Sequence, residues 1–399
     1  MAESPSPHHA QNEATDKTCP HAGICGGCAY QNIPYSEQLK IKNDAVLAYL
    51  AEYDIVPGEY RPVRETSKHF AYRNKMEYSF GDEVKGGPMT LGLHKQGSYM
   101  SVIDTAGCLI VPDVFNKICS AVLSWARSSG HGFHHKRAHK GFLRSLVLRR
   151  GERTGEVLVN LVTSSEETLD EDAFREAVLA AANHSADVIV GILHTINDRR
   201  SDVVACDSLK ILYGRDHYFE KLLGLDFRVG PFSFFQTNTS AVESMLDEAF
   251  DLIPGVRAET VYDVYCGTGA ISLALAGRAA LVTGIELVED SVLSARENAE
   301  RNGVKNTEFI CGDAFEVMQG LPAPDMIVVD PPRMGLHPKA LKRVIEFGLP
   351  SLLYISCNPK TFAQNAAVLK DAGYGVSVLG AYDNFPFTKH IELAALFAR

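Results

Sequence analysis

Residues 260–286, TVYDVYCGTGAISLALAGRAALVTGIE, contain two apolar strands separated by a glycine-rich turn and a helical stretch. The turn, residues 263–269, follows the first strand and precedes a helix that begins near Ala270. Glycines at such a turn let backbone N–H groups and a helix N-terminus approach a bound ligand. The turn has only GxG and lacks the third glycine of the dinucleotide fingerprint, so by itself it is weak evidence.

The same alternation of strand and helix continues to the C-terminus. Further apolar strands are TEFICGD, MIVVDPP, LLYISC, GVSVLG and HIELAALF, and residues 288–301 and 339–348 between them have helical periodicity. Continuous apolar strands with intervening helices predict a parallel sheet that is covered by helices on both faces. We therefore expect a Rossmann-like α/β domain over residues 229–399.

Three acidic residues follow successive strands of this predicted sheet. Glu286 ends the second strand, about twenty residues after the glycines, where an acid accepts hydrogen bonds from ribose hydroxyls. Asp313 follows the third strand, as a candidate acceptor for an adenine amino group, and Asp330 follows the fourth. A single acid at such a position is commonly a helix cap, but the strand ends together line the crevice where open α/β sheets bind ligands. Because no phosphate-binding glycine run or Walker lysine is present, the set predicts S-adenosylmethionine rather than NAD or ATP.

A thiol and a carboxylate are candidates for chemistry at this edge. Cys357 ends the LLYIS strand and is followed by Asn-Pro, so its thiol is expected over the same crevice, although a buried structural cysteine is the common alternative. Arg333 is a candidate for lowering the pKa of this thiol. Glu392 begins the last apolar strand, where partial burial would suit a general base, or it is a plain edge-strand acid.

Residues 19–228 predict a separate α+β domain. Residues 36–53 have helical spacing with Ser36 as a possible N-cap, and residues 69–112 alternate like hairpins around Gly-Gly-Pro. A second helix is expected at 114–127, and strands are expected at 142–149, 156–163, 188–197 and 209–212. The composition changes near residues 225–234, which sets the boundary at 228. Residues 1–18 are polar and are expected to form a disordered tail.

Charge and hydropathy limit the possible partners and the location. The net charge of −10 argues against nucleic acid, whose binders commonly have a basic face. Residues 131–153 are nevertheless basic, as is Tyr72-Arg73-Asn74-Lys75, so these segments form either a solvated surface or an RNA-binding patch. No apolar run reaches the roughly eighteen residues of a membrane helix, and the N-terminus lacks a signal-peptide core. We expect a cytoplasmic protein with reduced thiols, no membrane contact and no obligate protein partner.

Three of the nine cysteines, Cys19, Cys25 and Cys28, lie within ten residues, which favours a metal or redox site over disulfides. Cys108 is a candidate fourth ligand. Four cysteines can hold a [4Fe–4S] cluster or a tetrahedral zinc ion. Zinc sites more often use two CxxC pairs, and only one is present here.

Five motifs, in this order, resemble the RNA uracil-C5 methyltransferases: FQTN at 235–238, DVYCGTG at 263–269, DPPRMGL at 330–336, ISCNP at 355–359 and FPFTKHIE at 385–392. The four-cysteine set resembles that of their 23S ribosomal RNA branch. The likeness covers nearly the whole chain from Cys19 onwards. It implies an S-adenosylmethionine site made of Gln236, Tyr265, Glu286, Asp313 and Asp330. It also implies Cys357 as nucleophile, Glu392 as base, and a [4Fe–4S] cluster on Cys19, Cys25, Cys28 and Cys108.

The resemblance implies a two-step reaction in which Cys357 adds to C6 of uracil, C5 takes the methyl group and Glu392 removes the C5 proton. The cluster would then be structural or would position RNA, and Phe234 or Phe235 is either a stacking platform for the extruded base or core. Many cluster-bearing members have an N-terminal RNA-binding barrel, whereas this sequence has only the tail. The alternatives are a tRNA T-loop enzyme, an amino-methyltransferase suggested by Asp330-Pro331-Pro332, and a zinc-containing RNA-binding protein without catalysis.

Overall fold

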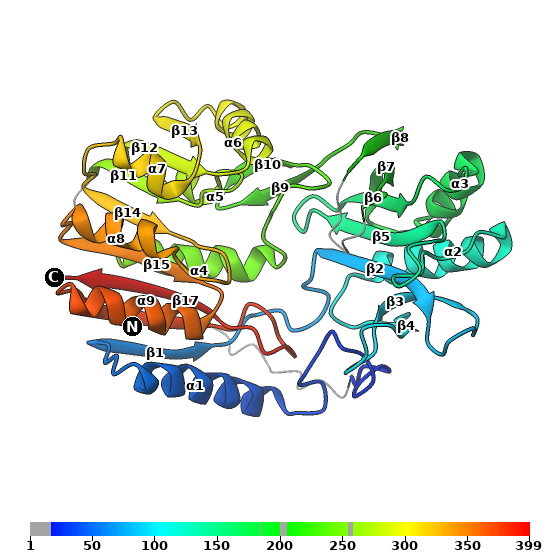
Figure 1. Cartoon of the computed structure of the whole chain (residues 1–399), viewed down its shortest axis with the longest axis horizontal. Helices are drawn as coiled ribbons and strands as arrows, with labels where there is room; N and C mark the ends of the chain where they lie inside the picture. The colour runs from blue at the N-terminus through cyan, green and yellow to red at the C-terminus, as the bar shows by residue number, and fades with distance from the viewer. Residues whose placement is uncertain (1–16, 184, 200–205, 254–257) are drawn as a thin grey trace, which may run out of the picture.

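The computed structural model describes residues 17–183, 185–199, 206–253 and 258–399. The tail expected at residues 1–18 lies outside the described residues, except for Lys17 and Thr18. Two sheets form two lobes that lie side by side, with the C-terminal half of the chain in one and cyan-to-green segments in the other (Figure 1).

The larger sheet has eight strands in the order β1-β16-β17-β15-β14-β11-β12-β13. Their bounds in that order are Glu59–Arg64, Gly375–Tyr382, Glu392–Ala398, Ser351–Ser356, Met326–Val329, Ala258–Val264, Ala279–Glu286 and Thr307–Cys311. All neighbours are parallel except β17, which runs antiparallel between β15 and β16. The expected Rossmann-like α/β fold is confirmed.

Helices cover both faces of this sheet, as the strand-helix alternation predicts. They are α1 (Tyr35–Glu52), α4 (Thr239–Asp251), α5 (Ala270–Leu275), α6 (Glu289–Arg301), α7 (Ala314–Gln319), α8 (Pro338–Glu346) and α9 (Pro359–Asp371). Two clusters of buried side chains lie beneath them. One contains Val46 with Phe362, and the other contains Met245 with Phe309.

Helix α1 and strand β1 belong to this sheet although they precede the smaller lobe in sequence. Strand β1 pairs in parallel with β16, and α1 packs against α9 and β1 (Figure 1). The expected domain of residues 19–228 therefore contributes α1 and β1 to the sheet of the other half. Strand β1 is therefore the edge strand of the larger sheet, beside β16. Ser36 is not the N-cap of α1, since Pro34 occupies that position without a side-chain cap.

The smaller lobe is a seven-stranded sheet in the order β4-β3-β2-β5-β6-β7-β8, and only β6 and β7 are parallel. These strands are Val102–Asp104, Met89–His94, Lys75–Asp82, Leu143–Arg150, Glu156–Thr163, Val188–Ile196 and Ser208–Gly214. Helices α2 (Asp113–Ser129) and α3 (Glu171–Ala181) bury the apolar face of the sheet, with Phe115 and Phe174 in its core. A hairpin of β9 (Tyr218–Leu222) and β10 (Leu225–Val229) follows. This lobe combines helices and a mostly antiparallel sheet, but it lacks α1 and β1 and so differs from the single domain expected over residues 19–228.

Candidate active site

The predicted site residues gather at one edge of the larger sheet. Strands β11, β12, β13, β14 and β15 are parallel, so their carboxyl ends lie at this edge. Tyr265 follows β11, Glu286 ends β12 and Asp313 comes two residues after β13. Asp330 and Cys357 come directly after β14 and β15. The sequence spacing and the strand order together build this edge.

The glycine-rich turn is held open by Glu286. Tyr265 has φ of 70°, Gly267 54° and Gly269 85°, so the turn uses the left-handed backbone region that glycine favours. One Glu286 oxygen accepts the backbone N–H of Gly267 at 3.1 Å, and the other accepts that of Val288 at 2.9 Å. Each oxygen has a second lone pair, so the carboxylate keeps capacity for a ribose hydroxyl.

Asp313 is a helix cap, as a single acid at a strand end commonly is. Its Oδ1 accepts the backbone N–H groups of Phe315 at 2.9 Å and of Glu316 at 3.3 Å at the start of α7. Its carboxylate is exposed at the same edge, and its charge, together with that of Glu286, adds to burial in raising the pKa of the Tyr265 hydroxyl. The cap therefore fixes Asp313 beside the turn.

Cys357 and Glu392 face one another because of the β15–β17 register. Ser356, the last residue of β15, pairs with Leu393 in this antiparallel pair, so the residue that follows β15 and the first residue of β17 are the next positions along the two segments. Burial, followed by the charges of Glu392 and Asp330, raises the pKa of the Cys357 thiol to about 11. Burial, followed by Asp330, raises the pKa of Glu392 to about 8. The thiol and the carboxyl group are thus electrostatic neighbours.

Arg333 is the cation of this group. Its charge lowers the pKa of both Cys357 and Glu392, which offsets part of the effect of burial. The Arg333 carbonyl accepts the Asn358 side-chain amide at 2.9 Å, so the turn after Cys357 fixes its backbone. Its guanidinium lies 3.1 Å from the His390 ring. Burial and Arg333 lower the pKa of His390 to about 4, so this ring is neutral and accepts the bond.

His390 and Asp263 are the residues that the sequence analysis did not select. His390 precedes Glu392 by two residues inside the FPFTKHIE motif, and that position was the available signal. Asp263 is fully buried below the turn and accepts the Ser272 hydroxyl at 2.5 Å. Burial raises the pKa of Asp263 to about 7, and burial followed by the charge of Asp263 raises that of Asp330 to about 7.

Gln236 lies on the loop before α4, which contacts of the smaller lobe hold in place. The Asn74 side-chain amide donates to the Gln236 carbonyl at 3.1 Å and to the Thr239 hydroxyl at 2.9 Å. The Asn238 amide donates to the Asn384 carbonyl at 2.7 Å, in the loop before Glu392. The loop that carries Gln236 is therefore tied to both the smaller lobe and the predicted base.

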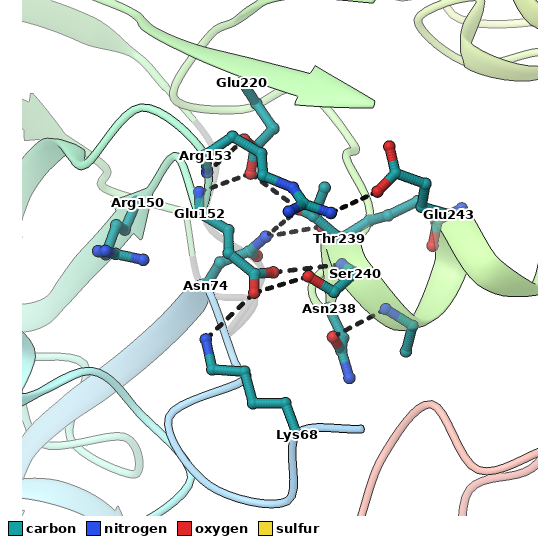
Figure 2. Close-up of polar contacts among 12 residues, drawn as sticks. Lys68, Asn74, Arg150, Glu152, Arg153, Glu220, Asn238, Thr239, Ser240 and Glu243 are labelled. Atoms are coloured by element: carbon teal, nitrogen blue, oxygen red, sulfur yellow. Dashed lines mark hydrogen bonds and ion pairs between the residues drawn. The ribbon is translucent and has the colours of Figure 1, made fainter. Parts of the chain in front are cut away.

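Two carboxylates complete this junction between the lobes, and Figure 2 shows both pointing at the start of α4. Glu220, fully buried on β9, accepts the Thr239 hydroxyl at 2.8 Å and the Glu152 backbone N–H at 2.6 Å. Glu152 accepts the Ser240 hydroxyl at 2.9 Å and Lys68 at 3.1 Å. Buried polar networks of this kind fix geometry when their members are paired.

Comparison with known proteins identifies the family. The tRNA (uracil-5-)-methyltransferase family matches residues 207–399. An uncharacterized RNA methyltransferase of Clostridium tetani is 45% identical over 94% of this chain and 82% of its own length. One from Caldanaerobacter subterraneus is 43% identical over 96% and 85%. The chain belongs to the RNA uracil-C5 methyltransferase family.

A solved relative shows the same architecture with a cofactor product bound. The tRNA (uracil-54, C5)-methyltransferase of Pyrococcus abyssi, in complex with S-adenosyl-L-homocysteine, is 28% identical. It matches 94% of this chain and 85% of its own, with a TM-score of 0.77. This protein is therefore an S-adenosylmethionine-dependent RNA methyltransferase with a mixed α/β fold. Among the described residues, no helix is both long and apolar enough to cross a bilayer.

The four cysteines predicted to bind a metal group in this methyltransferase line one small cavity, together with Leu93 and Ile110. They are Cys19, Cys25, Cys28 and Cys108. Burial and the neighbouring thiols raise the pKa of Cys28 to about 11 and that of Cys108 to about 12. Mutual repulsion of thiolates is what a bound cation relieves, so the donor set fits a metal group. Among the described residues, however, no three His, Cys, Asp or Glu side chains are placed to hold a single metal ion. The four expected ligands thus line the same cavity, but among the described residues they are not arranged to bind a single metal ion.

Some basic side chains of residues 131–153 are buried or form ion pairs within this methyltransferase. Arg149 is buried, Arg150 pairs with Asp187 at 2.8 Å, and Arg153 pairs with Glu243 across the lobes. Three of the seven cations of residues 131–153 are thus structural, whereas Arg137 and Lys140 of the same segment are exposed.

The two phenylalanines beside Gln236 have different environments. Phe235 is buried and packs against Phe227 with ring centroids 5.5 Å apart, so it is core. Phe234 is 65% exposed, which leaves it as the candidate stacking platform for the target base. A groove of about 880 Å³ lined by Leu225, Phe250 and Lys305 includes none of the predicted site residues.

Proposed function

We propose that this enzyme methylates C5 of a uridine in 23S ribosomal RNA through a covalent bond between Cys357 and C6 of the uracil. The observation that carries the proposal is the β15–β17 register, which sets Cys357 and Glu392 opposite one another at the cofactor edge. An amino-methyltransferase does not need a thiol beside a carboxylate, and neither does a protein without catalysis.

The residues divide the reaction into addition and elimination. The Cys357 thiolate adds to C6, and the electron pair of the C5–C6 bond moves onto C5 and O4. S-adenosylmethionine, when bound, would supply an electrophilic methyl group to C5, and S-adenosylhomocysteine would leave as the sulfonium–methyl bond breaks. Glu392 then takes the C5 proton, and the re-formed double bond expels the Cys357 thiolate. Splitting one hard substitution into two easier steps is the general advantage of covalent catalysis.

Arg333 and Asp330 set the charge balance that these steps need. A thiol with pKa near 11 is a poor nucleophile at neutral pH, so the guanidinium of Arg333 helps to form the thiolate. Glu392, with pKa near 8, is ready to hold a proton once it has taken it from C5. Gln236, Tyr265, Glu286, Asp313 and Asp330 would hold the cofactor at the glycine-rich turn.

The cysteine-lined cavity would hold a [4Fe–4S] cluster on Cys19, Cys25, Cys28 and Cys108. A tetrahedral zinc ion requires thiolates about 4 Å apart, because its bonds to sulfur are about 2.3 Å. A [4Fe–4S] cluster takes four cysteine thiolates as ligands, and the four cysteines share the lining of this one cavity. The chemistry transfers no net electrons, so the cluster would be structural or would position RNA.

Two RNA classes fit the site. The four-cysteine set favours 23S ribosomal RNA, by its resemblance to that branch. The name of the Pyrococcus abyssi relative, at 28% identity, supports tRNA as the second candidate. Mapping 5-methyluridine in both RNAs from a deletion strain distinguishes them: loss from 23S RNA supports the proposal, and loss only from tRNA overturns its choice of substrate.

The covalent step is tested with RNA that contains 5-fluorouridine. Fluorine replaces the C5 proton, so elimination is blocked and the wild-type enzyme should form a denaturant-stable adduct through Cys357. Cys357→Ala should form no adduct and lose methylation by at least ~10³-fold. Cys206→Ala, at an exposed position outside the site, is the matched control and should behave as wild type. Unchanged turnover in Cys357→Ala would instead indicate an amino-methyltransferase.

A further inference from the structure

The loop that leads into the predicted base, residues 383–391, is clamped by a buried ion pair. Asp383 directly follows β16, whose last residue pairs with Glu392, so this end of the loop is next to the base. Lys42, on α1, contacts Asp383 Oδ1 at 2.6 Å, and the two side chains are 1% and 0% exposed. The partners are 341 positions apart in sequence.

The pair holds the backbone of one loop residue from two sides. Lys42 Nζ donates a second bond to the Phe385 carbonyl at 3.1 Å. Asp383 Oδ1 accepts the Phe385 N–H at 3.1 Å. The Phe385 ring in turn packs edge-on against His390, with centroids 5.9 Å apart, and His390 contacts Arg333. The ion pair is thus connected through Phe385 and His390 to the residues around Glu392.

Phe387, two residues after Phe385, has an unfavourable backbone conformation. Phe387 has φ of 66°, in the left-handed region, which is unfavourable for a bulky side chain. Its carbonyl accepts the backbone N–H groups of Ala29 and Tyr30, both at 2.9 Å, and its own N–H donates to Gln38 at 3.0 Å. Such strain persists only where surrounding contacts over-determine it.

Stability alone does not account for a buried Lys–Asp pair. Two desolvated charges are expensive, and apolar residues of similar size are often as stable or more so. The Tyr35 hydroxyl is a further polar neighbour of Asp383, and the Asp383 charge adds to burial in raising the pKa of Tyr35, so the pair is part of a buried polar group. Its bonds to Phe385 are instead directional, which apolar packing cannot reproduce.

We propose that Lys42 and Asp383 are positioning residues that fix the loop so that Glu392 reaches the C5 proton. This inference rests on the proposed function, in which Glu392 acts after the covalent bond and the methyl transfer. A misplaced base therefore leaves addition and methylation possible but slows release of the enzyme from RNA. Errors of about 1 Å in such groups can cost about 10²-fold in rate.

The test uses the full-length enzyme, S-adenosylmethionine and ordinary uridine-containing RNA. Lys42→Met should lower kcat by roughly 10- to 100-fold and leave KM for the cofactor within about twofold. It should also accumulate a denaturant-stable enzyme–RNA adduct that carries the new methyl group, which wild type does not. Loss of stability alone would not produce that adduct.

A second variant separates position from stability. Lys42→Met/Asp383→Leu replaces the pair by apolar side chains, so its melting temperature should equal or exceed that of wild type. It should still accumulate the methylated adduct, because both bonds to Phe385 are gone. Arg150→Met, which removes the half-buried pair with Asp187 in the smaller lobe, is the control and should form no adduct.

Glu392→Gln distinguishes failure of this inference from failure of the proposed function. It should accumulate the methylated adduct strongly, and absence of that adduct would overturn the role of Glu392 and with it the positioning role. If Glu392→Gln traps RNA while the folded double variant turns over at the wild-type rate, only the positioning role is wrong. Loss of the 5-fluorouridine adduct in the double variant would also overturn it, since addition would then be the impaired step.

Discussion

At the residue scale, the site contains several acidic side chains whose pKa values are raised. Asp263, Asp330 and Glu392 all have pKa values raised mainly by burial, to about 7, 7 and 8. Raised values of this kind are typical of functional sites, where desolvation and like charges are combined. A positively charged sulfonium ligand suits such a group, because it would stabilise the ionised acids.

The pH dependence of elimination follows from Glu392. A carboxyl with raised pKa is protonated below about 8 and becomes a base above it, so the rate should rise with pH through a midpoint near 8. Asp330→Asn removes the negative charge that raises this pKa, so the midpoint should move down. Single-turnover rates at saturating cofactor between about pH 6 and 9.5 measure both. Asp251→Asn, an exposed acid, is the control, and an unmoved midpoint in Asp330→Asn would contradict the assignment.

At the scale of elements, contacts between the two lobes fix the loop before α4, which carries Gln236. Thr239, the first residue of α4, is held by Asn74, which directly precedes β2, and by Glu220 of β9, as Figure 2 shows. Asn238 caps α4 through the Ala241 N–H and also contacts the loop before Glu392. One short loop thus links the smaller lobe to the loop that leads into Glu392, the proposed base.

Asn74→Ala should loosen this loop without unfolding either sheet. Two bonds are lost, and the Gln236 carbonyl and Thr239 hydroxyl lose a donor, which costs about 1–3 kcal/mol. If about 1.4 kcal/mol of this falls on the bound state, Kd for S-adenosylmethionine rises about tenfold, measurable by calorimetry.

Asn302→Ala is the matched control for that measurement. Asn302 also bridges two segments, with bonds to the Asp226 backbone at 2.8 Å, but it lies outside the cofactor edge. It should lower the melting temperature and leave cofactor affinity unchanged. Equal affinity losses in both variants would mean that Asn74 acts only through general stability.

At the scale of the whole molecule, the N-terminal segment joins the two lobes. Residues 19–31 contact the smaller sheet through Gly26, whose N–H donates to the His94 carbonyl at 2.9 Å, and the loop before Glu392 through Ala29 and Tyr30. Helix α1 and strand β1 then extend the larger sheet. Metal bound between Cys28 and Cys108 would therefore fasten the segment to the smaller lobe.

Metal loss should weaken this connection. Anaerobically prepared wild type should contain about four iron atoms per chain, with the visible absorption of a [4Fe–4S] cluster. Cys108→Ser should lose the absorption and melt at a lower temperature, because binding free energy of a metal group adds to folding. Cys206→Ser, exposed and outside the cavity, should keep both. Full iron content in Cys108→Ser would show that this ligand assignment is wrong.

The sequence by itself determined the local elements and the residues at the strand ends. Continuous apolar runs mark the strands of this sheet because parallel strands are buried on both faces, and the strand ends carry Glu286, Asp330 and Cys357. These positions need no knowledge of distant contacts, since parallel strands share one edge. The motif order then identified the family.

The tertiary structure decided which distant segments meet. Lys42 pairs with Asp383, β1 joins β16, and Asn74 reaches the Gln236 loop, all between segments far apart in sequence. Periodicity reports only which face of an element is apolar, so it cannot indicate which partner buries that face. The pairing of Cys357 with Glu392 also depends on register, which is fixed by packing of both strands in the sheet.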